Sequence, residues 1–346
     1  MDVPRVTIIV VVRERFSDSR RALEALYANT PEPFRLVYVD AGSPPRLRRF
    51  LATEAGTRGF QLVRQDEFLN NNQSRNLGLR HAAADTPYVV FLDNDAVPEP
   101  GWLGTLLRTA EETGAAVVGP LYLLGEPGSG VIHVGAGDAH FVAGPGQRHF
   151  VERHPFANQH VERVRHRLVR VHCEAVEFHC MLVRRDVLTR VGPFDEALHS
   201  MAEHTDFCLR VREHGGAIYH EPAAAVTYVI PRRLALTDLP YFARRWSDAW
   251  TDATVERFST KWDVDPEDPG MRAIRNHARN HRHLALEPVE RGLVRLLGWR
   301  WGHWLGHDVL RALEVRLNRW WVPAPTMRRP RAAPPRTQTT RRAQGA

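Results

Sequence analysis

The first 120 residues alternate between short apolar runs and amphipathic stretches. A short run of β-branched and aromatic residues is typical of a strand buried in a parallel sheet, whereas apolar residues at helical spacing indicate a surface helix. The pattern predicts strands at 6–12, 34–39, 60–63 and 88–92, and helices at 19–28, 46–56, 102–113 and from the polar segment 70–75 to residue 84. This alternation predicts a Rossmann-like α/β fold with a mostly parallel central sheet and helices on both faces.

The pattern becomes less regular after residue 118. The segment 119–146 is rich in glycine, and we interpret it as an irregular excursion that includes room for a hairpin. Apolar runs then resume, and we expect the first two of them to rejoin the sheet. They predict strands at 169–173, 178–183, 217–220 and 224–229, with helices at 184–191 and 205–213.

Beyond Pro231 the sequence changes to long helical patterns. Residues 238–262 carry aromatic side chains at helical spacing, and the amphipathic stretch 289–321 holds five of the nine tryptophans among Arg and His. Such a stretch either makes a peripheral contact with a membrane surface or packs back on the preceding domain with its tryptophans inward. We expect 236–325 to be a helical C-terminal region and the Arg- and Pro-rich tail 326–346 to be disordered.

Composition narrows the class of protein. The tail holds six Arg and no acid, so the net charge of +7 over 346 residues leaves a body with 41 basic and 40 acidic residues. A near-neutral body does not indicate nucleic-acid binding. The three cysteines lack metal-type spacing, and no signal-peptide or transmembrane pattern surrounds the first apolar run. We therefore expect a cytoplasmic protein, with a peripheral position at the inner face of the membrane as the other possibility. The oligomeric state stays unknown.

The strand predicted at 88–92 ends in Asp93-Asn94-Asp95. Two carboxylates this close repel each other, so one would be pushed toward protonation unless a cation lies between them. Ligands of open α/β sheets bind at the carboxyl ends of the strands, and hard oxygen ligands suit Mg²⁺ or Mn²⁺. The segment therefore indicates either a divalent-cation site for a phosphate-bearing ligand or an ordinary acidic turn.

Several further segments resemble family 2 glycosyltransferases with the GT-A fold. The β-branched first strand and the segments VDAGS, NNQSRNLGLRHA, FLDNDA, HCMLVRRDVLTRVGPFDE and EHTDFCLRVREHGG follow one another in the family's order within residues 5–230. The resemblance implies a GT-A domain over 1–235, with a nucleotide-sugar-binding half at 1–118 and an acceptor half at 119–235. It also implies a hexosyltransferase-type enzyme that moves a sugar, with inversion, from a nucleoside-diphosphate sugar (UDP- or dTDP-linked) to an acceptor hydroxyl. The acceptor would be a glycan, a glycolipid or lipid-linked acceptor, or another cell-envelope or secondary-metabolite precursor.

The resemblance also assigns roles on the donor side. Asp40 would hold the nucleobase, and Arg75 with Asn76 would bind the donor at a helix N-terminus, which favours anions. Asp95 would ligate Mn²⁺ or Mg²⁺ directly, while Asp93 would contact the ribose or metal-bound water. The metal would stabilise the charge that builds on the leaving diphosphate.

The acceptor side departs from the family pattern. Family members usually show Glu-Asp where this chain has Glu203-His204, and the Asp of that pair is normally the general base. Because histidine is a competent base near neutral pH, Glu203 and His204 both stay candidates. Asp206 is a third candidate, with a structural role at the helix N-terminus as its alternative. Tyr228 stands where many members place a metal-binding histidine.

These departures keep a rival open. The chain could be a catalytically inactive GT-A protein that binds a sugar nucleotide or serves as a scaffold. A nucleotidyltransferase is less consistent with the sequence, because the segment after the first strand, residues 13–16, contains no glycine. Neither the sugar nor the acceptor can be read from the sequence.

Overall fold

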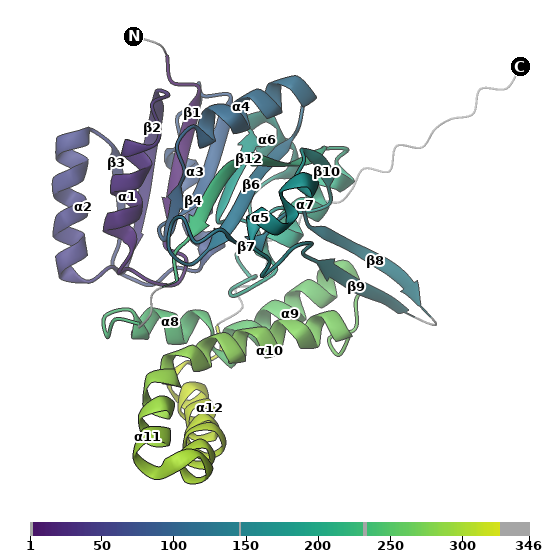
Figure 1. The fold of residues 1–346 in the computed structure, drawn as a ribbon. Helices are drawn as coiled ribbons and strands as arrows, with labels where there is room; N and C mark the ends of the chain where they lie inside the picture. The colour runs from purple at the N-terminus through teal and green to yellow at the C-terminus, as the bar shows by residue number, and fades with distance from the viewer. Residues whose placement is uncertain (1–2, 145–146, 231–233, 326–346) are drawn as a thin grey trace, which may run out of the picture.

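The computed structural model describes residues 3–144, 147–230 and 234–325. Its main sheet follows the strand order β10-β12-β6-β11-β4-β1-β2-β3 (Figure 1). Six of these eight strands run in one direction, whereas β10 and β11 oppose them, as do the two short strands β5 and β7 that pair outside this order. The sheet is therefore mostly parallel, as predicted. The bounds are β1 Val6–Val11, β2 Phe34–Ala41, β3 Gln61–Gln65, β4 Tyr88–Asp93, β6 Val117–Leu124, β10 Val171–Cys173, β11 Cys180–Arg184 and β12 Ile218–Tyr228.

Alternate residues of the central strands face two separate cores. In β1, Ile9 and Val11 belong to one buried cluster, whereas Ile8 and Val10 belong to the other. This two-sided burial explains why the strand reads as a continuous apolar run. Helices α3 (Asn71–His81), α6 (Arg185–Val191) and α7 (Glu203–Glu213) cover the first face, and α1 (Ser19–Ala28), α2 (Pro45–Arg58) and α4 (Trp102–Thr113) cover the second.

The prediction of an irregular excursion from residue 119 was wrong. Strand β6 occupies this region in the middle of the sheet, between β12 and β11. The prediction rested on the glycine content of the whole segment, whereas β6 itself contains the Gly119-Pro120 step, and proline is normally excluded from central strands. Here the β11 pairing covers only Val117 and Val118, and the β12 ladder shifts register directly beside Pro120. The missing proline N–H is thus placed where the hydrogen-bond ladders are already interrupted.

The remainder of that segment includes a hairpin, as expected. Strands β8 (Asp138–Gly144) and β9 (Gln147–Arg153) form a separate two-stranded sheet, while β7 (Val131–Val134) and β5 (Ala96–Pro98) extend the main sheet at β6 and β12. The strands expected at 217–220 and 224–229 are one strand, β12, with the irregularity between Glu221 and Ala225.

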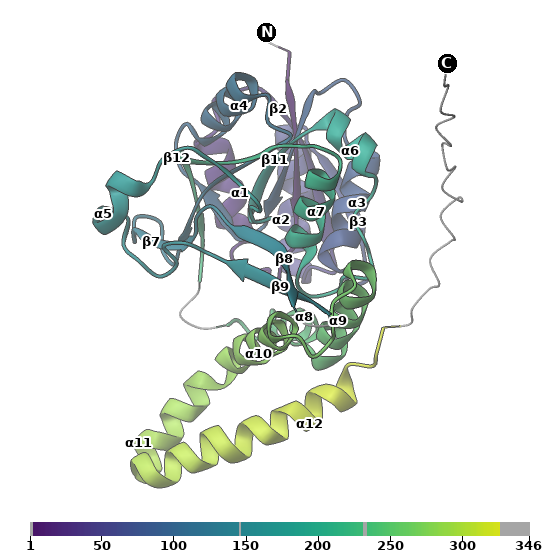
Figure 2. The same cartoon turned by 90° about the vertical axis from the view of Figure 1, so that its right-hand side faces the viewer.

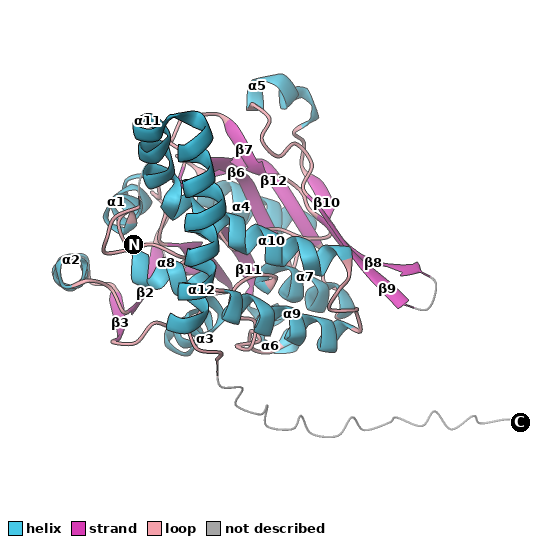
Figure 3. Cartoon of the chain, turned by 90° about the horizontal axis from the view of Figure 1, so that it is seen from below, coloured by secondary structure: helices cyan, strands magenta, loops and turns pink. Residues whose placement is uncertain are grey.

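Three C-terminal helices lie across the carboxyl ends of the parallel strands (Figures 1 and 3). The long helical stretch predicted at 238–262 divides into α8 (Leu239–Arg245) and α9 (Asp248–Trp262), because Ser247 caps a new helix. Helix α10 (Pro269–His283) follows and packs on α9 and β9.

The last helices form a hairpin that extends away from the sheet (Figure 2). Helix α11 (Glu287–His303) contains a break at Gly298, beyond which the chain returns through a π-helical segment, Trp304–Leu310, into α12 (Arg311–Trp321). All five tryptophans of this region are at least half exposed. The alternative in which they pack inward on the preceding domain is therefore wrong. None of the described helices has a stretch long and apolar enough to cross a membrane. The tail at 326–346 lies outside the described residues.

Candidate active site

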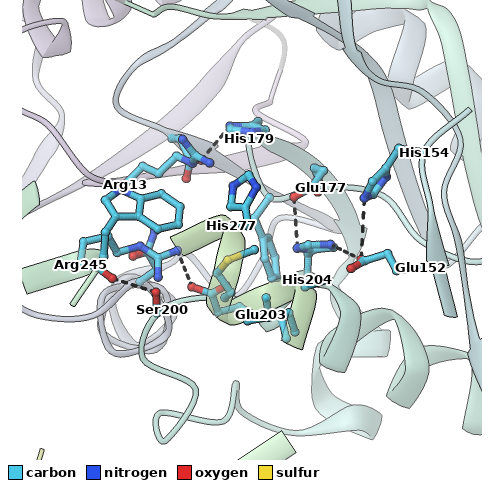
Figure 4. A pocket seen from close by; sticks show the side chains of 18 of the residues that line it. Arg13, Glu152, His154, Glu177, His179, Ser200, Glu203, His204, Arg245 and His277 are labelled. Carbon is cyan, nitrogen blue, oxygen red and sulfur yellow. Dashed lines mark hydrogen bonds and ion pairs between the residues drawn. The ribbon is translucent and has the colours of Figure 1, made fainter. Parts of the chain in front are cut away.

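A cavity of about 460 Å³ lies between the carboxyl ends of the strands and the C-terminal helices (Figure 4). Each side of the cavity is supplied by different elements. The sheet side carries Arg13 after β1 and Asp93 at the end of β4, and the opposite side carries Trp246 after α8 and His277 on α10. The remaining charged and histidine side chains of the wall are Arg75, His133, Glu152, His154, Glu177, His179, Glu203, His204 and Arg245.

Asp93 lies between two guanidinium groups and an imidazole ring. Its carboxylate oxygens lie 3.6 Å from Arg75 NH2 and 3.5 Å from Arg13 Nε, and His179 Nδ1 lies 3.2 Å away. Burial raises the pKa of Asp93 to about 6, although Arg75 and Arg13 act to lower it. The Arg75 guanidinium lies over the Phe178 ring at 3.8 Å, which holds the group flat against the cavity wall. Two predicted donor residues, Arg75 and Asp93, therefore meet in one site.

Asp95 lies deeper than Asp93. It is completely buried, and Arg15 NH2 donates to its Oδ2 at 3.2 Å. Among the described residues, the cavity wall includes Asp93 and not Asp95. Burial raises the pKa of Asp95 to about 7, against the lowering effect of Arg15 and Arg13.

Two observations bear on whether these acids suit a divalent cation. The Oδ1 atoms of Asp93 and Asp95 are both buried and have no hydrogen-bond partner among the described residues. Orphaned carboxylate oxygens of this kind are suitable ligands for Mg²⁺ or Mn²⁺. No group of three or more His, Cys, Asp or Glu able to hold a metal occurs in the described part of the chain. The two orphaned oxygens are compatible with a divalent cation, which would need its other ligands from outside the described residues.

Tyr228, which replaces the family histidine, is fully engaged. Its hydroxyl donates to Glu14 Oε1 at 2.6 Å, and its ring stacks on His179 with centroids 4.6 Å apart. The Arg13 guanidinium covers the ring at 4.3 Å. Tyr228 thus holds the Arg13 guanidinium and the His179 ring beside Asp93. Many family members have a metal-binding histidine where this chain has Tyr228.

Asp40 and Asn76 lie outside the cavity wall. Asp40 is buried at the end of β2, where Arg64 NH1 donates to its Oδ2 at 2.7 Å and the Ser43 hydroxyl donates at 2.9 Å. Asn76 on α3 donates to the Phe194 carbonyl at 2.9 Å and accepts from the Phe194 N–H at 2.9 Å. Asn76 therefore ties α3 to the turn before α7, and the structure does not bring it to Asp93.

His204 lines the cavity between two carboxylates. Its Nε2 lies 3.0 Å from Glu152 Oε1 and its Nδ1 lies 3.1 Å from Glu177 Oε2 (Figure 4). Burial alone would lower the pKa of His204, but Glu177 and Glu152 outweigh it and raise the pKa to about 9. Burial likewise favours a higher pKa for Glu152, yet the hydrogen bond with His204 holds that pKa at about 2. At neutral pH the imidazole is therefore a cation between two carboxylates, with both ring N–H groups donating.

The other two predicted catalytic residues differ in their surroundings. Glu203 lines the cavity, and its Oε1 accepts from Arg245 NH2 at 2.8 Å. Asp206, one turn along α7, faces α9, where Trp262 Nε1 donates at 3.0 Å and Lys261 Nζ lies 2.6 Å away. Asp206 thus joins α7 to α9, and Glu203 is the acid that the helix presents to the cavity.

Sequence reasoning did not predict several cavity residues, among them Arg13, Glu152, Glu177, Arg245 and His277. Glu152 comes from the β8–β9 hairpin, and Arg245 and His277 come from helices beyond the family motifs. Arg245 falls in the predicted helical stretch 238–262, but nothing in the local pattern of these segments indicates that their side chains reach the cavity. The sequence also has eight histidines from 133 to 179, for which we expect loop and surface positions, with His179 near the acceptor-side wall. His133, His154 and His179 line the cavity.

Comparison with known proteins identifies the class to which this site belongs. The family model for glycosyl transferase family 2 matches residues 7–192, which is more than half of the chain. The chain therefore belongs to glycosyl transferase family 2. Among solved structures, it is similar to that of GalNAc-T7 with UDP, GalNAc and Mn²⁺, with a TM-score of 0.51 and 16% identity over 80% of this chain and 54% of that one. This likeness shows that the fold is GT-A.

Two curated relatives are more similar in sequence. A pre-mycofactocin glycosyltransferase of Mycobacterium tuberculosis is 29% identical over 226 residues, which cover 64% of this chain and 42% of that protein. A glucosyl-dolichyl phosphate glucuronosyltransferase of Haloferax volcanii is 26% identical over 234 residues, or 63% of this chain and 67% of that protein. The chain thus spans less than half the length of the first relative, and the two relatives differ in acceptor.

Proposed function

We propose that this chain is an inverting glycosyltransferase that moves a sugar from a nucleoside-diphosphate sugar to an acceptor hydroxyl. One observation supports the proposal: Arg13, Arg75 and Asp93 line the same cavity as the acids Glu152, Glu177 and Glu203. Such a cavity can hold an anionic leaving group at one end and deprotonate a hydroxyl at the other. The membership in glycosyl transferase family 2 supports this assignment.

The donor would bind with its diphosphate against the cationic end of the cavity. Arg75 is buried and the Arg13 side chain is 14% exposed, so a phosphate contact with either would be only partly screened by solvent. A uridine or deoxythymidine base would then extend toward Asp40, which is presently held by Arg64 and Ser43. For Asp40 to accept a ring N–H from the base, the Arg64 contact would have to rearrange.

Asp95 and Asp93 would hold a divalent cation, Mn²⁺ or Mg²⁺, if one accompanies the donor. When bound, the cation would supply neutralisation of the charge on the departing diphosphate. The protein's own contribution is the guanidinium wall: Arg13 and Arg75 orient the diphosphate and balance its charge. Asp95→Ala should abolish metal-dependent donor turnover, and turnover that stays unchanged would contradict the metal role.

Glu203 is the general base in this proposal. His204 carries a proton on each ring nitrogen at neutral pH, because both contact carboxylates and its pKa is raised to about 9. It therefore cannot accept another proton. Glu203 takes the proton of the acceptor hydroxyl, whose oxygen attacks the anomeric carbon as the bond to the diphosphate breaks. The configuration of the sugar inverts in this single displacement.

A donor panel tests the proposal. Thermal shift and calorimetry with UDP-, dTDP- and GDP-sugars, each with and without Mn²⁺, should show stabilisation by at least one donor, because a ligand bound only to the folded state raises its stability. Metal-assisted donor hydrolysis should accompany binding. Binding without any hydrolysis or transfer would favour the alternative of an inactive sugar-nucleotide-binding or scaffold protein, for which the histidine at the usual base position is the specific argument.

The acceptor is proposed only by class: a glycan, a lipid-linked acceptor, or a cell-envelope or secondary-metabolite precursor that offers a hydroxyl. The acceptor end of the cavity is lined by β9, which belongs to the β8–β9 hairpin, and by α10, which lies beyond the residues that the family model matches. Acceptor choice would therefore depend on these elements.

A further inference from the structure

The turn of the C-terminal hairpin exposes a compact group of apolar and cationic side chains. Residues 295–301, here called the hairpin tip, are all exposed and read Arg-Leu-Leu-Gly-Trp-Arg-Trp. Leu296 is 82% exposed, Trp299 71% and Trp301 62%. Exposed aromatic and aliphatic side chains in such continuity are uncommon on the surface of a monomer and indicate an interaction site.

The hairpin is built so that this tip stays at its far end. Gly298 has φ 75° and ψ 169°, a conformation that an L side chain would strain, and this break lets the chain reverse. The two legs then pack closely, because a Cβ on Gly302 would lie 2.4 Å from the Val294 Cα. Arg311 closes the pair with two bonds to Glu290, at 2.5 and 2.8 Å.

The base of the hairpin is fixed to the rest of the protein. Arg282 and His283 at the end of α10 contact the Glu314 carboxylate at 2.6 and 3.2 Å, and Asn318 donates to the Ala243 carbonyl at 3.0 Å. Arg319 also donates to Asp248 at 2.9 Å. The tip is thus presented on a supported arm, and Figure 2 shows it at the end most distant from the sheet.

Charge selects among the surfaces that the tip could meet. Residues 291–307 contain three Arg, two His and no acid. Arg295 and Arg300, inside the tip, form no ion pair with any described residue. A second copy meeting the tip symmetrically would bring these like charges together, at a cost. An anionic lipid surface would instead satisfy both guanidinium groups while it accepts the leucine and tryptophan side chains.

We propose that the hairpin tip inserts into the interfacial layer of an anionic lipid bilayer and anchors the protein there peripherally. Leu296, Leu297 and the two tryptophans of the tip, Trp299 and Trp301, enter the boundary between headgroups and acyl chains. Arg295 and Arg300 remain with the lipid phosphates. This anchoring is independent of the proposed reaction, because none of the tip residues lines the catalytic cavity.

Flotation of the full chain with lipid vesicles tests the proposal. The protein should float with phosphatidylcholine vesicles that contain phosphatidylglycerol, and much less with phosphatidylcholine alone. Replacing Leu296 and Leu297 together with Ser should lower the partition coefficient roughly tenfold or more, because buried aliphatic surface is lost. Replacing Arg295 and Arg300 together with Gln should lower it roughly thirtyfold on anionic vesicles and change it little on neutral ones.

The matched control is Trp320→Ala, which removes an 83% exposed tryptophan at the other end of the hairpin. Its partition should match the wild type. Loss of binding in this control as large as in the tip variants would overturn insertion by the tip. Failure of the wild type to bind anionic vesicles at low salt would overturn the proposal entirely.

A labelling experiment reports insertion directly. The three native cysteines are buried, so a cysteine introduced at position 297 can be labelled selectively with an environment-sensitive fluorophore. Its emission should shift to the blue on anionic vesicles, whereas the same label in a Leu317→Cys variant should not shift. If instead the tip variants abolish a dimer seen by light scattering without lipid, the surface belongs to a second copy and the proposal fails.

Discussion

Buried carboxylates are balanced by cations at both ends of the cavity, but the cations differ in kind. At the donor end, Asp93 and Asp95 are balanced by Arg13, Arg15 and Arg75. At the acceptor end, Glu152 and Glu177 are balanced by one imidazole, His204. Guanidinium groups keep their charge at every physiological pH, whereas an imidazolium can lose its charge. The arginines of the donor end thus keep their charge, and its pH dependence comes from Asp93 and Asp95, whose pKa values burial raises to about 6 and about 7. At the acceptor end it is the cation, His204, that titrates, with a pKa of about 9.

The largest effect should come from the proposed base. Glu203→Gln keeps the size of the side chain and the Arg245 contact but removes proton acceptance, so kcat should fall about 10²- to 10⁴-fold with little change in donor affinity. Glu213→Gln, at an exposed position on the same helix, is the control and should leave kcat unchanged. A Glu203→Gln variant with near-normal kcat would move the base to another acid.

The pH profile sharpens this assignment. If Glu203 and not His204 is the base, deprotonation of His204 near pH 9 should not raise kcat. A rate that instead keeps rising through pH 9 would identify neutral His204 as the base, since its pKa is about 9. Steady-state kinetics in overlapping buffers from pH 5 to 10 distinguish the two.

A substitution of Arg75 tests the donor end of the cavity. Arg75→Ala should weaken donor binding roughly ten- to hundredfold, because a buried charged hydrogen bond to phosphate is lost. Calorimetry with the preferred donor measures the loss. Arg35→Ala, an exposed arginine on β2, is the matched control, and equal weakening in both variants would contradict a phosphate contact at Arg75.

His204 also contributes to stability. Its pKa in the folded protein is raised above the unfolded value, so its contribution is fully present below about pH 6.5 and is lost as the pH rises through about 9. The difference in free energy of unfolding between the wild type and His204→Gln should reach about 3 kcal/mol near neutral pH and shrink toward pH 10. Denaturant unfolding at several pH values measures it, and a difference that does not change with pH would show that the ring stays neutral.

The smallest effect isolates one carboxylate. Glu152→Gln should lower the pKa of His204 by about one pH unit, because one of its two acidic partners becomes neutral. NMR titration of the His204 ring measures this shift, with Glu162→Gln on the exposed α5 segment (Val161–Val164) as the control. An unchanged pKa would mean that Glu177 alone sets the charge of the ring.

Much of the donor end could be predicted from the sequence, because each residue follows directly on a strand or begins a helix whose pattern is readable locally. Asp93 ends β4, and the capping box of Asn70 with Gln73 starts α3 and so places Arg75. The acceptor end could not be predicted in this way. Glu152 contacts His204, and Arg245 contacts Glu203, each from an element more than 40 residues away in sequence. No local pattern specifies such contacts. Strand β6 was missed for a related reason. The register shift that accommodates Pro120 lies in its partner β12, so it cannot be read from the residues around Pro120.

Glu14 has a consequence for anyone who would shorten or recombine this protein. It is wholly buried and receives Tyr228 Oη, Trp246 Nε1 and His281 Nε2 at 2.6, 2.9 and 3.1 Å. Burial would raise its pKa, but His281, Arg13 and Arg15 hold that pKa well below its usual value. Trimming the chain at residue 235 would therefore strand an anion in the interior as well as remove one wall of the cavity. Chimeras that exchange C-terminal regions between relatives should therefore take Glu14 and its three hydrogen-bond donors from the same parent protein.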